Sequence, residues 1–355
     1  MPEHHDAKLS SRSQVYLGLV LAVFVCAPAG AELKIAPLKF PVESRTPGVW
    51  VPFASSHPPS ARRDETVTRI LISVHSSGYD ALQYYENARI AASKVPGASR
   101  QTLIIAPQFF HKNAVPGQIP KGLLYWTVPP YRGSSRGAIG PEENKLSISA
   151  FEILDDMLSQ LSDKKVFPRL KDLVLVGHSA GGQLVQRYAL VGKFGPPQGI
   201  NCRFVVCAPS SFAYPTPERR VPGSNGRFAK PSREAIASNP SFHNWGYGLA
   251  KPYGYFKGFN PKATIKRYGR RNVYYLCGER DTNGNDGTTS TNGAAMMQGS
   301  NRRDRTETFY EYLLHTYGKG IAERHKMAIT PGVGHYGRGN MTSKAGLRFL
   351  FADKP

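Results

Sequence analysis

One serine of this chain stands in a sequence setting that makes a hydroxyl group reactive. Residues 177–181 read Gly-His-Ser-Ala-Gly, so Ser179 is the central residue of a G-x-S-x-G motif. An apolar run at 173–176 precedes the motif, and the pattern after it predicts a helix over 181–191. A serine on a sharp strand-to-helix turn needs small neighbours, because its backbone is strained there. The new helix directs its first amides at developing negative charge, so we predict that Ser179 is a nucleophile.

The same segment resembles the nucleophile elbow of esterases and lipases of the α/β-hydrolase superfamily. The resemblance covers roughly residues 66–350 as an order of elements, although only the elbow is specific. It implies an α/β fold with a mainly parallel central sheet, helices on both faces and an inserted cap or lid. It also implies a triad in the chain order serine, acid, histidine, and it implies no cofactor.

The triad order that the resemblance implies selects His335 as the base. This histidine lies in a glycine-rich loop after the last predicted strand, at 327–330. Two other histidines follow the acid region, but His315 falls within a predicted helix. His325 is expected to precede its strand, at the opposite end of the sheet. A residue of an ordinary surface loop is the alternative interpretation of His335.

The acid is expected directly after the strand predicted at 273–277. Asp281 is the preferred candidate, with Glu279 and Asp286 as alternatives. A carboxylate in this place fixes the tautomer of the imidazole and stabilises the imidazolium that forms. A turn residue, or the partner of a nearby arginine, is the competing interpretation of Asp281.

The resemblance further implies two backbone amides that form an oxyanion hole. Ala180 follows the nucleophile and is expected to supply one of them. The other is expected in the loop after the first core strand, where residues 75–78 read His-Ser-Ser-Gly. Ser76 stands where the family usually has glycine, so the donor is open between Ser76 and Ser77, and we favour Ser77. A plain strand-ending turn is the alternative.

Candidate substrate-binding residues come from two regions with little periodicity. The first region contributes Tyr125, Trp126 and Tyr131, and the second contributes Trp245, Tyr247, Tyr253, Tyr255 and Phe256. Aromatic side chains of this kind line pockets for acyl or aryl groups. They equally form the small apolar core that a long loop needs, and the sequence leaves both interpretations open.

Residues 281–287, Asp-Thr-Asn-Gly-Asn-Asp-Gly, have the composition of a calcium loop but depart from its pattern. The glycine falls one position too late, and Asn292 replaces the terminal glutamate. A polar loop that positions Asp281 is the simpler account. We therefore expect no metal site, and no cofactor is implied.

The elements that must position these groups alternate between strand and helix. A short strand is expected near Val49–Phe53. Apolar runs then predict strands at 68–74, 102–106, 173–176, 204–208, 273–277 and 327–330. Capping residues and helical spacing predict helices at 80–94, 147–161, 181–191, 306–317 and 344–351. This alternation is typical of βαβ units and of a mainly parallel sheet that is buried on both faces.

Two long stretches interrupt the alternation. Residues 108–145 are expected to form an irregular loop that contains aromatic residues. Residues 209–271 are rich in Pro, Gly, Tyr and Trp, and a stretch of this length points to a cap or lid over the sheet. The predicted organisation is a signal peptide at 1–31, followed by one α/β-hydrolase domain at 32–355 that contains this insertion.

The signal peptide is predicted from an apolar run at 15–25, which follows basic residues and precedes small residues at 29–31. The run is too short for a comfortable membrane span, and no later segment has the length to cross a bilayer. The expected location is therefore secreted or periplasmic. Four cysteines are present, and Cys26 falls within the apolar run. The other three allow at most one disulfide, and small buried apolar residues are their default role.

The formal net charge is +21, from 46 Lys and Arg against 25 Asp and Glu. Such a surface favours anionic partners. The basic residues are scattered and form no nucleic-acid-binding motif, so no nucleic-acid partner is expected. The expected partner is a small-molecule or polymeric ester, which the charge allows to be anionic. The expected reaction is hydrolysis of a carboxylic ester through an acyl-enzyme. A secreted peptidase or amidase of the same fold, and a non-catalytic envelope-binding protein, are the alternatives.

Overall fold

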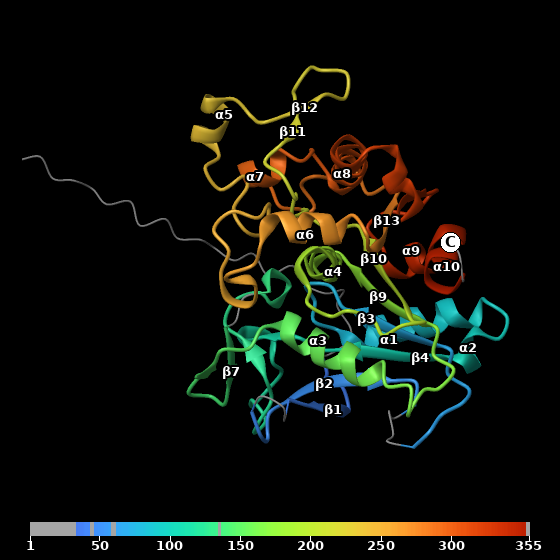
Figure 1. The fold of residues 1–355 in the computed structure, drawn as a ribbon. Helices are drawn as coiled ribbons and strands as arrows, with labels where there is room; N and C mark the ends of the chain where they lie inside the picture. The colour runs from blue at the N-terminus through green and yellow to red at the C-terminus, as the bar shows by residue number, and fades with distance from the viewer. Residues whose placement is uncertain (1–32, 43–45, 58–61, 134–135, 353–355) are drawn as a thin grey trace, which may run out of the picture.

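The computed structural model describes the whole chain except residues 1–32, 43–45, 58–61, 134–135 and 353–355. Within the described residues, the centre of the molecule is one sheet of eight strands in the order β1-β2-β4-β3-β9-β10-β13-β14 (Figure 1). The strands are Leu38–Pro41 (β1), Trp50–Ser55 (β2), Arg69–Val74 (β3), Thr102–Pro107 (β4), Asp172–His178 (β9), Asn201–Cys207 (β10), Asn272–Gly278 (β13) and His325–Thr330 (β14). β1, β2 and β4 pair antiparallel, and all pairs from β4 to β14 are parallel. The predicted mainly parallel sheet is confirmed.

Helices cover both faces of the sheet, as expected for strands that are apolar throughout (Figure 1). In β3, Ile70 and Ile72 point into one apolar cluster and Leu71 points into the other. The covering helices of the first face are Ala150–Leu161 (α3), Ala180–Val191 (α4) and Arg302–Tyr317 (α8). Those of the second face are Ala81–Ser93 (α1), Gly337–Thr342 (α9) and Lys344–Phe351 (α10).

The ends of the helices follow the capping residues of the sequence. The side chain of Asp80 accepts a hydrogen bond from the amide of Gln83 at 2.9 Å, as expected for the start of α1. α8 begins four residues earlier than predicted, because Asn301 caps it by accepting from the amide of Asp304. His325 is the first residue of β14 and does not precede the strand, so that boundary was wrong by a few residues.

The predicted irregular loop at 108–145 is wrong in part, because short strands pair within it. Within the described residues it contains a four-stranded sheet in the order β5-β6-β7-β8. Its elements are Phe110–His111 (β5), Lys112–Ala114 (η1), Tyr125–Trp126 (β6), Pro130–Arg132 (η2), Gly137–Ile139 (β7) and Asn144–Leu146 (β8). Strands of two or three residues are too short to show a hydrophobic period, and their pairing is non-local.

The segment expected to form a cap, 209–271, contains short elements joined by ordered loops. They are Arg219–Arg220 (β11), Phe228–Ala229 (β12), Arg233–Ser238 (α5), Gly254–Phe256 (η3) and Pro261–Tyr268 (α6). β11, β12 and α5 lie at the far side of the molecule from β1 (Figure 1). Arg219 is 2% exposed and donates to the carbonyls of Phe242 and Tyr247, so it joins the start of the segment to its middle. Its role as a lid stays a prediction.

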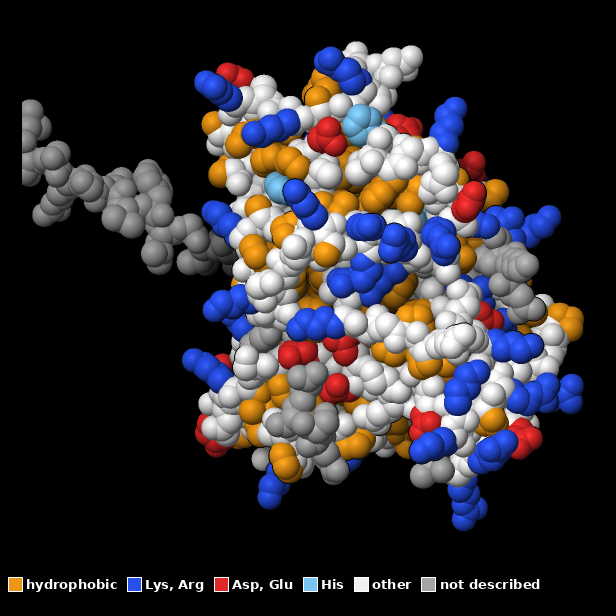
Figure 2. All heavy atoms as spheres, in the orientation of Figure 1, with side chains coloured by type: hydrophobic (Ala, Val, Ile, Leu, Met, Phe, Trp, Pro, Cys, Tyr) orange, Lys and Arg blue, Asp and Glu red, His pale blue; other side chains and the backbone are white. Residues whose placement is uncertain are grey.

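The remaining short helices are Ala98–Gln101 (α2), Gly293–Met296 (α7) and Lys319–Glu323 (η4). The signal peptide predicted at 1–31 lies outside the described residues. Over the part of the chain that is described, no helix is both long and apolar enough to cross a bilayer. The described cysteines, Cys202, Cys207 and Cys277, are free thiols, so none of them forms a disulfide with another. Lys and Arg side chains are spread over the face shown in Figure 2.

Candidate active site

The turn from β9 to α4 holds Ser179 in an unusual backbone conformation. Its φ is 57° and its ψ is −117°, a backbone conformation that residues other than glycine rarely adopt. The amide of Ser179 donates to the carbonyl of Cys207 on the neighbouring strand β10 at 2.9 Å, which holds the turn against the sheet. A strained residue of this kind persists only where the surrounding structure determines it, and such residues concentrate at functional sites.

The glycines of the motif are required by close contact between backbone segments. A Cβ at Gly177 would lie 2.3 Å from the carbonyl oxygen of Gly181. A Cβ at Gly181 would lie 2.5 Å from the carbonyl oxygens of Val74 and His75, at the end of β3. No side chain fits at these distances, so α4 begins directly against the ends of β3 and β9. This is the strand-to-helix turn that the sequence predicted.

The turn lies at the topological switch point of the sheet, where successive strands are added on opposite sides. From β3 the chain passes through α1 to β4 on one side, whereas from β9 it passes through α4 to β10 on the other. Ligands of open α/β sheets bind at such a switch point, beyond the carboxyl ends of the strands. Ser77, which follows β3, and Ala180, the first residue of α4, both line the cavity next to Ser179. Both expected oxyanion donors therefore lie at the site.

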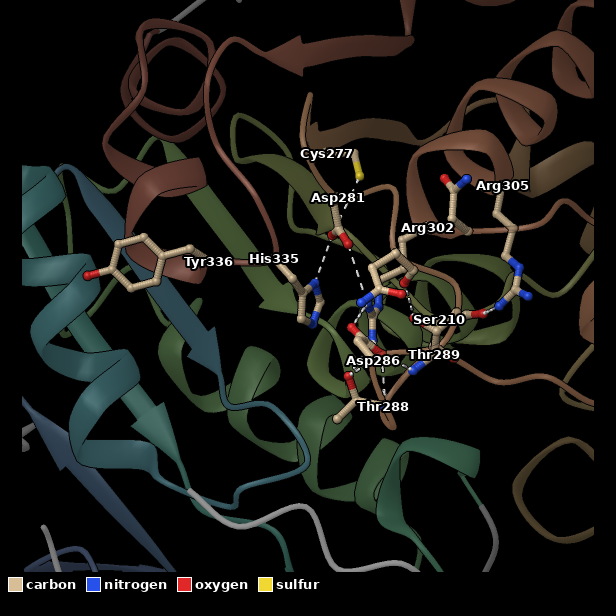
Figure 3. A network of polar contacts seen from close by, with 12 residues as sticks. Ser210, Cys277, Asp281, Asp286, Thr288, Thr289, Arg302, Arg305, His335 and Tyr336 are labelled. Atoms are coloured by element: carbon tan, nitrogen blue, oxygen red, sulfur yellow. Dashed lines mark hydrogen bonds and ion pairs between the residues drawn. The ribbon is translucent and has the colours of Figure 1, made fainter. Parts of the chain in front are cut away.

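His335 and Asp281 are in direct contact, although 54 residues separate them. Nδ1 of His335 lies 2.8 Å from Oδ2 of Asp281 (Figure 3). Asp281 follows β13, and its side chain is 2% exposed; His335 follows β14, and its side chain is 22% exposed. Because β13 and β14 are parallel neighbours, the loops after them meet at one edge of the sheet. The carboxylate fixes one ring nitrogen of His335 and leaves Nε2 for a reacting group.

The imidazole of His335 lies beside the elbow. Its ring packs on the ring of His178, with the centroids 4.5 Å apart, and His178 is the residue before Ser179. Nδ1 of His178 lies 2.9 Å from the hydroxyl of Tyr84 on α1. Burial, and then the neighbouring His335, lower the pKa of His178 well below its ordinary value, so it packs against His335 as a neutral ring.

The two alternative acids have other partners. Oε2 of Glu279 accepts from the amide of Gly332 at 2.8 Å, which ties the loops after β13 and β14 together. Asp286 is in contact with Arg302 of α8, and Arg302 also reaches Oδ1 of Asp281 at 3.3 Å. Of the three candidates, the structure brings only Asp281 to His335.

A cysteine lies behind the acid. Sγ of Cys277, on β13, is 3.9 Å from Oδ2 of Asp281. Burial, and then the charge of Asp281, raise the pKa of Cys277 far above its ordinary value, so its thiol stays protonated and points toward the carboxylate. Asp281 thus accepts on both oxygens, from His335 and Cys277 on one and from Arg302 on the other.

A cavity of about 320 Å³ opens next to Ser179. Much of its wall consists of hydroxyl and amide groups, which come from the segments after β10 and β13. These residues are Ser210, Ser211, Thr288, Thr289, Ser290 and Asn292. Arg187 of α4 is 3% exposed and joins the walls, because it donates to Gln183, to Ser211 and to the carbonyls of Tyr131 and Gly246. The cavity suits a small polar group better than a long apolar chain.

Of the aromatic residues expected in the pocket, the structure brings Tyr131, Trp245, Tyr247 and Tyr253 to the cavity. Trp245 is 8% exposed, and its ring also packs on Phe256, with centroids 3.7 Å apart. Tyr125 and Trp126 are 0% exposed, and their polar atoms donate to the carbonyls of Gly140 and Ile148. The second interpretation, a small apolar core, describes these two residues.

Sequence reasoning missed Arg187 and Arg302. Arg187 lies on a helix that was predicted, but the pattern gives no sign that it is buried. Arg302 lies 21 residues after Asp281 and is the first residue of α8, in the turn that precedes the predicted start of this helix. A buried arginine resembles any other arginine in a basic sequence, so no local signal was available.

Comparison with known proteins shows solved structures of similar architecture. No family model and no curated protein matches the sequence. The fold is similar to that of a poly(aspartic acid) hydrolase from Sphingomonas sp. KT-1, with a TM-score of 0.56 and 20% identity over 90% of this chain and 99% of the other. It is also similar to a poly(3-hydroxybutyrate) depolymerase from Bordetella parapertussis, with a TM-score of 0.57 and 17% identity over 88% of this chain and 87% of the other. With its sheet order, its elbow and these likenesses, the chain has the α/β-hydrolase fold.

Proposed function

We propose that this protein is a serine hydrolase that cleaves carboxylic esters through an acyl-enzyme. One observation carries the proposal: a histidine bonded to a buried carboxylate packs on the residue before a strained serine. Strain at Ser179, an oriented His335 and a polar cavity beside the serine are the parts that nucleophilic catalysis needs. A binding protein that had only kept the scaffold has no need of a strained backbone at residue 179.

In the proposed reaction, Oγ of Ser179 attacks the carbonyl carbon while its proton passes to Nε2 of His335. The carbonyl electron pair moves to oxygen, and the amides of Ala180 and Ser77 stabilise the resulting oxyanion. The tetrahedral intermediate collapses, the bond to the alcohol oxygen breaks, and His335 protonates that oxygen. Water then attacks the acyl-enzyme by the same route, and Ser179 recovers its proton. Asp281 keeps its charge throughout and stabilises the imidazolium.

The proposed substrate is a small polar ester or a polyester with short, polar repeating units. The hydroxyl-lined cavity supports this class over esters of long fatty acids. The two similar structures are named for hydrolases of polymers whose repeating units are short, one of them anionic. The net charge of +21 also fits an anionic substrate. An exported enzyme, which the predicted signal peptide implies, would meet such polymers outside the cytoplasm.

An amidase is the second candidate, and one observation favours it. The poly(aspartic acid) hydrolase cleaves, by its name, a polymer of amino acids, and the present chain matches 99% of its length. The same triad serves both reactions, because only the leaving group differs. Comparing an acyl p-nitrophenyl ester with the matching p-nitroanilide separates the two. We expect turnover of the ester, and efficient turnover of the anilide would reverse the ranking.

Labelling with an organophosphonate tests the proposal directly. Intact mass spectrometry of the wild-type protein should show one adduct, and peptide mapping should place it on Ser179. Ser179→Ala should take no label. Ser211→Ala is the matched control, since it removes another hydroxyl of the cavity and should still be labelled. A wild-type protein that takes no label and hydrolyses no p-nitrophenyl ester would contradict the proposal and favour a binding function.

A further inference from the structure

An arginine of α8 lies at the centre of the polar network behind the site (Figure 3). Arg302 is 0% exposed. Its Nη1 lies 3.3 Å from Oδ1 of Asp281 and 2.5 Å from Oδ2 of Asp286, and its Nη2 lies 3.3 Å from Oδ1 of Asp286. The guanidinium therefore holds two carboxylates at once, and one of them is the partner of His335.

The two carboxylates differ in their surroundings. Both carboxylate oxygens of Asp281 accept hydrogen bonds, and the side chain is 2% exposed. Asp286 is 22% exposed, and burial alone would raise its pKa. Hydrogen bonds from Arg302 and from the amide of Thr288 outweigh burial and lower the pKa of Asp286 well below its ordinary value. Arg302 and Asp286 thus form a charge-balanced pair beside the acid.

This balance decides how much negative charge faces the base. With Arg302 and Asp286 cancelling each other, one uncompensated negative charge, that of Asp281, remains next to His335. Other titratable groups also face this ring or its carboxylate. They are Cys277 of β13, His178 of β9, and Tyr84 of α1 behind His178. Burial keeps all of these neutral, because it raises the pKa of Cys277 and Tyr84 and lowers that of His178.

The same arginine also reaches the wall of the cavity. Nη2 of Arg302 donates to the hydroxyl of Thr288, and Asp286 accepts from the amides of Thr288 and Thr289 at 2.9 and 2.7 Å. Thr288 and Thr289 both line the cavity next to Ser179. One buried side chain therefore links the acid that orients the base to the residues that border the substrate.

We propose that Arg302 is a positioning residue for the hydrolase reaction, and that with Asp286 it holds Asp281 against His335 and fixes the 287–289 wall of the cavity. The proposal rests on the proposed function, since it concerns the same site. Arg302 touches neither the serine nor the substrate in this account. It acts through the orientation of Asp281, through the charge next to the base, and through the shape of the cavity.

Charge substitutions on the pair test the proposal, with the pH profile of kcat/KM as the readout. Arg302→Gln leaves a surplus negative charge near the imidazole, so protonated His335 is favoured. The acid limb, which is the fall of kcat/KM at low pH, then moves to higher pH. Asp286→Asn leaves a surplus positive charge and moves the limb to lower pH. We expect each single variant to change kcat/KM on the acid limb by roughly three- to tenfold, in opposite directions. The double variant restores the balance, and its limb should return close to the wild-type position.

Arg302→Lys separates charge from geometry. The ammonium keeps the positive charge, so the acid limb should stay near the wild-type position. It lacks the planar guanidinium that bonds both carboxylates and Thr288 at once. The cavity wall should therefore become less well ordered, and KM should rise. Arg303→Gln is the matched control from the same helix, because Arg303 is 36% exposed and pairs with Glu307. Its solvated charge should leave the limb in place.

A purely structural role for Arg302 predicts a different pattern. Activity would then fall by the same factor at every pH, and the limbs of Arg302→Gln and Asp286→Asn would not move apart. That result overturns the proposal while the proposed function stands, because wild-type protein would still be active and labelled at Ser179. If wild-type protein is neither active nor labelled, the proposed function itself fails. Should Arg302→Gln not fold, the acid limb of Asp286→Asn compared with that of the wild type decides the direction of the shift.

Discussion

The two halves of the site are built in different ways. The half that contains the proposed nucleophile, Ser179, is one continuous segment, 172–191, in which β9, Ser179 and α4 follow one another. Its geometry comes from backbone packed on backbone, with no room for a Cβ at Gly177 or Gly181. The acid half joins the loop after β13 to α8 through charged side chains, with Arg302 between Asp281 and Asp286. Local sequence encodes the first half, and long-range ion pairs form the second.

This difference indicates which property a substitution in each half should change, stability or reaction rate. Steric contact between backbone atoms does not depend on charge, so damage to the elbow should appear as lost stability. The acid half depends on which groups carry charge, so damage there should appear first in the rate of the reaction and in its pH dependence. Three predictions test this contrast, beginning with the largest expected effect.

Asp281→Asn should lower kcat by about 10⁴-fold with little change in stability, because the amide no longer fixes the productive tautomer of His335. Steady-state kinetics with a p-nitrophenyl ester measure the loss, and urea denaturation measures the stability. Glu279→Gln is the control: its carboxylate contacts the amide of Gly332, so the rate should change by less than about tenfold. Equal losses in the two variants would contradict the assignment of the acid.

Gly181→Ala should break the elbow by steric overlap. Its Cβ would lie 2.5 Å from two carbonyl oxygens at the end of β3. We expect the free energy of unfolding to fall by about 3 kcal/mol, or the protein not to fold at all. Gly195→Ala is the control, because its Cβ would meet no atom within 4 Å. If urea denaturation gives both variants the stability of the wild type, the elbow is less tightly packed than described.

Acidification should destabilise the end of β3, on which the elbow packs, through His75. Burial lowers the pKa of His75 from 6.5 to about 4, and its Nε2 accepts from the amide of Phe109 at 2.9 Å. The unfolded chain therefore binds a proton that the folded protein does not bind between these pH values. Stability from this group is complete above pH 6.5 and is lost as the pH falls toward 4, at about 1.4 kcal/mol per pH unit.

Urea denaturation between pH 7 and 4.5 measures this slope. His75→Gln should reduce this slope by the contribution of about one bound proton, because the titrating group is gone. His315→Gln is the matched control, because it replaces a histidine whose side chain is 41% exposed. An unchanged slope in His75→Gln would place the acid sensitivity elsewhere.

The same contrast explains what sequence reasoning recovered. The apolar strands and capped helices were predicted because their signals are local, as in the apolar run before Gly177 and the cap at Asp80. The small sheet within 108–145 was missed, since its strands are two or three residues long. Tyr125 was a candidate for the pocket because an aromatic residue in a loop looks the same whether it is buried or exposed. Its 0% exposure depends on contacts that no local pattern reports.

Within the site, the residue types were predicted better than their connections. Ser179 and His335 each follow a glycine-rich turn signal, and Asp281 follows the end of a strand. The family order then paired histidine with acid, and the structure brings those two side chains together. Arg302 had no such guide, because its importance comes from the 0% exposure and two carboxylates that the fold gives it.

The two halves of the site are proposed to act as a single catalytic unit, and a mutant cycle on Ser179 and His335 tests this most directly. The measurement is kcat/KM for Ser179→Ala, His335→Ala and the double variant on one p-nitrophenyl ester. If serine and imidazole work together, each single variant loses nearly all activity, and the double variant is about as active as either. Losses that multiply in the double variant, or a Ser179→Ala protein that keeps most of its activity, would contradict the account.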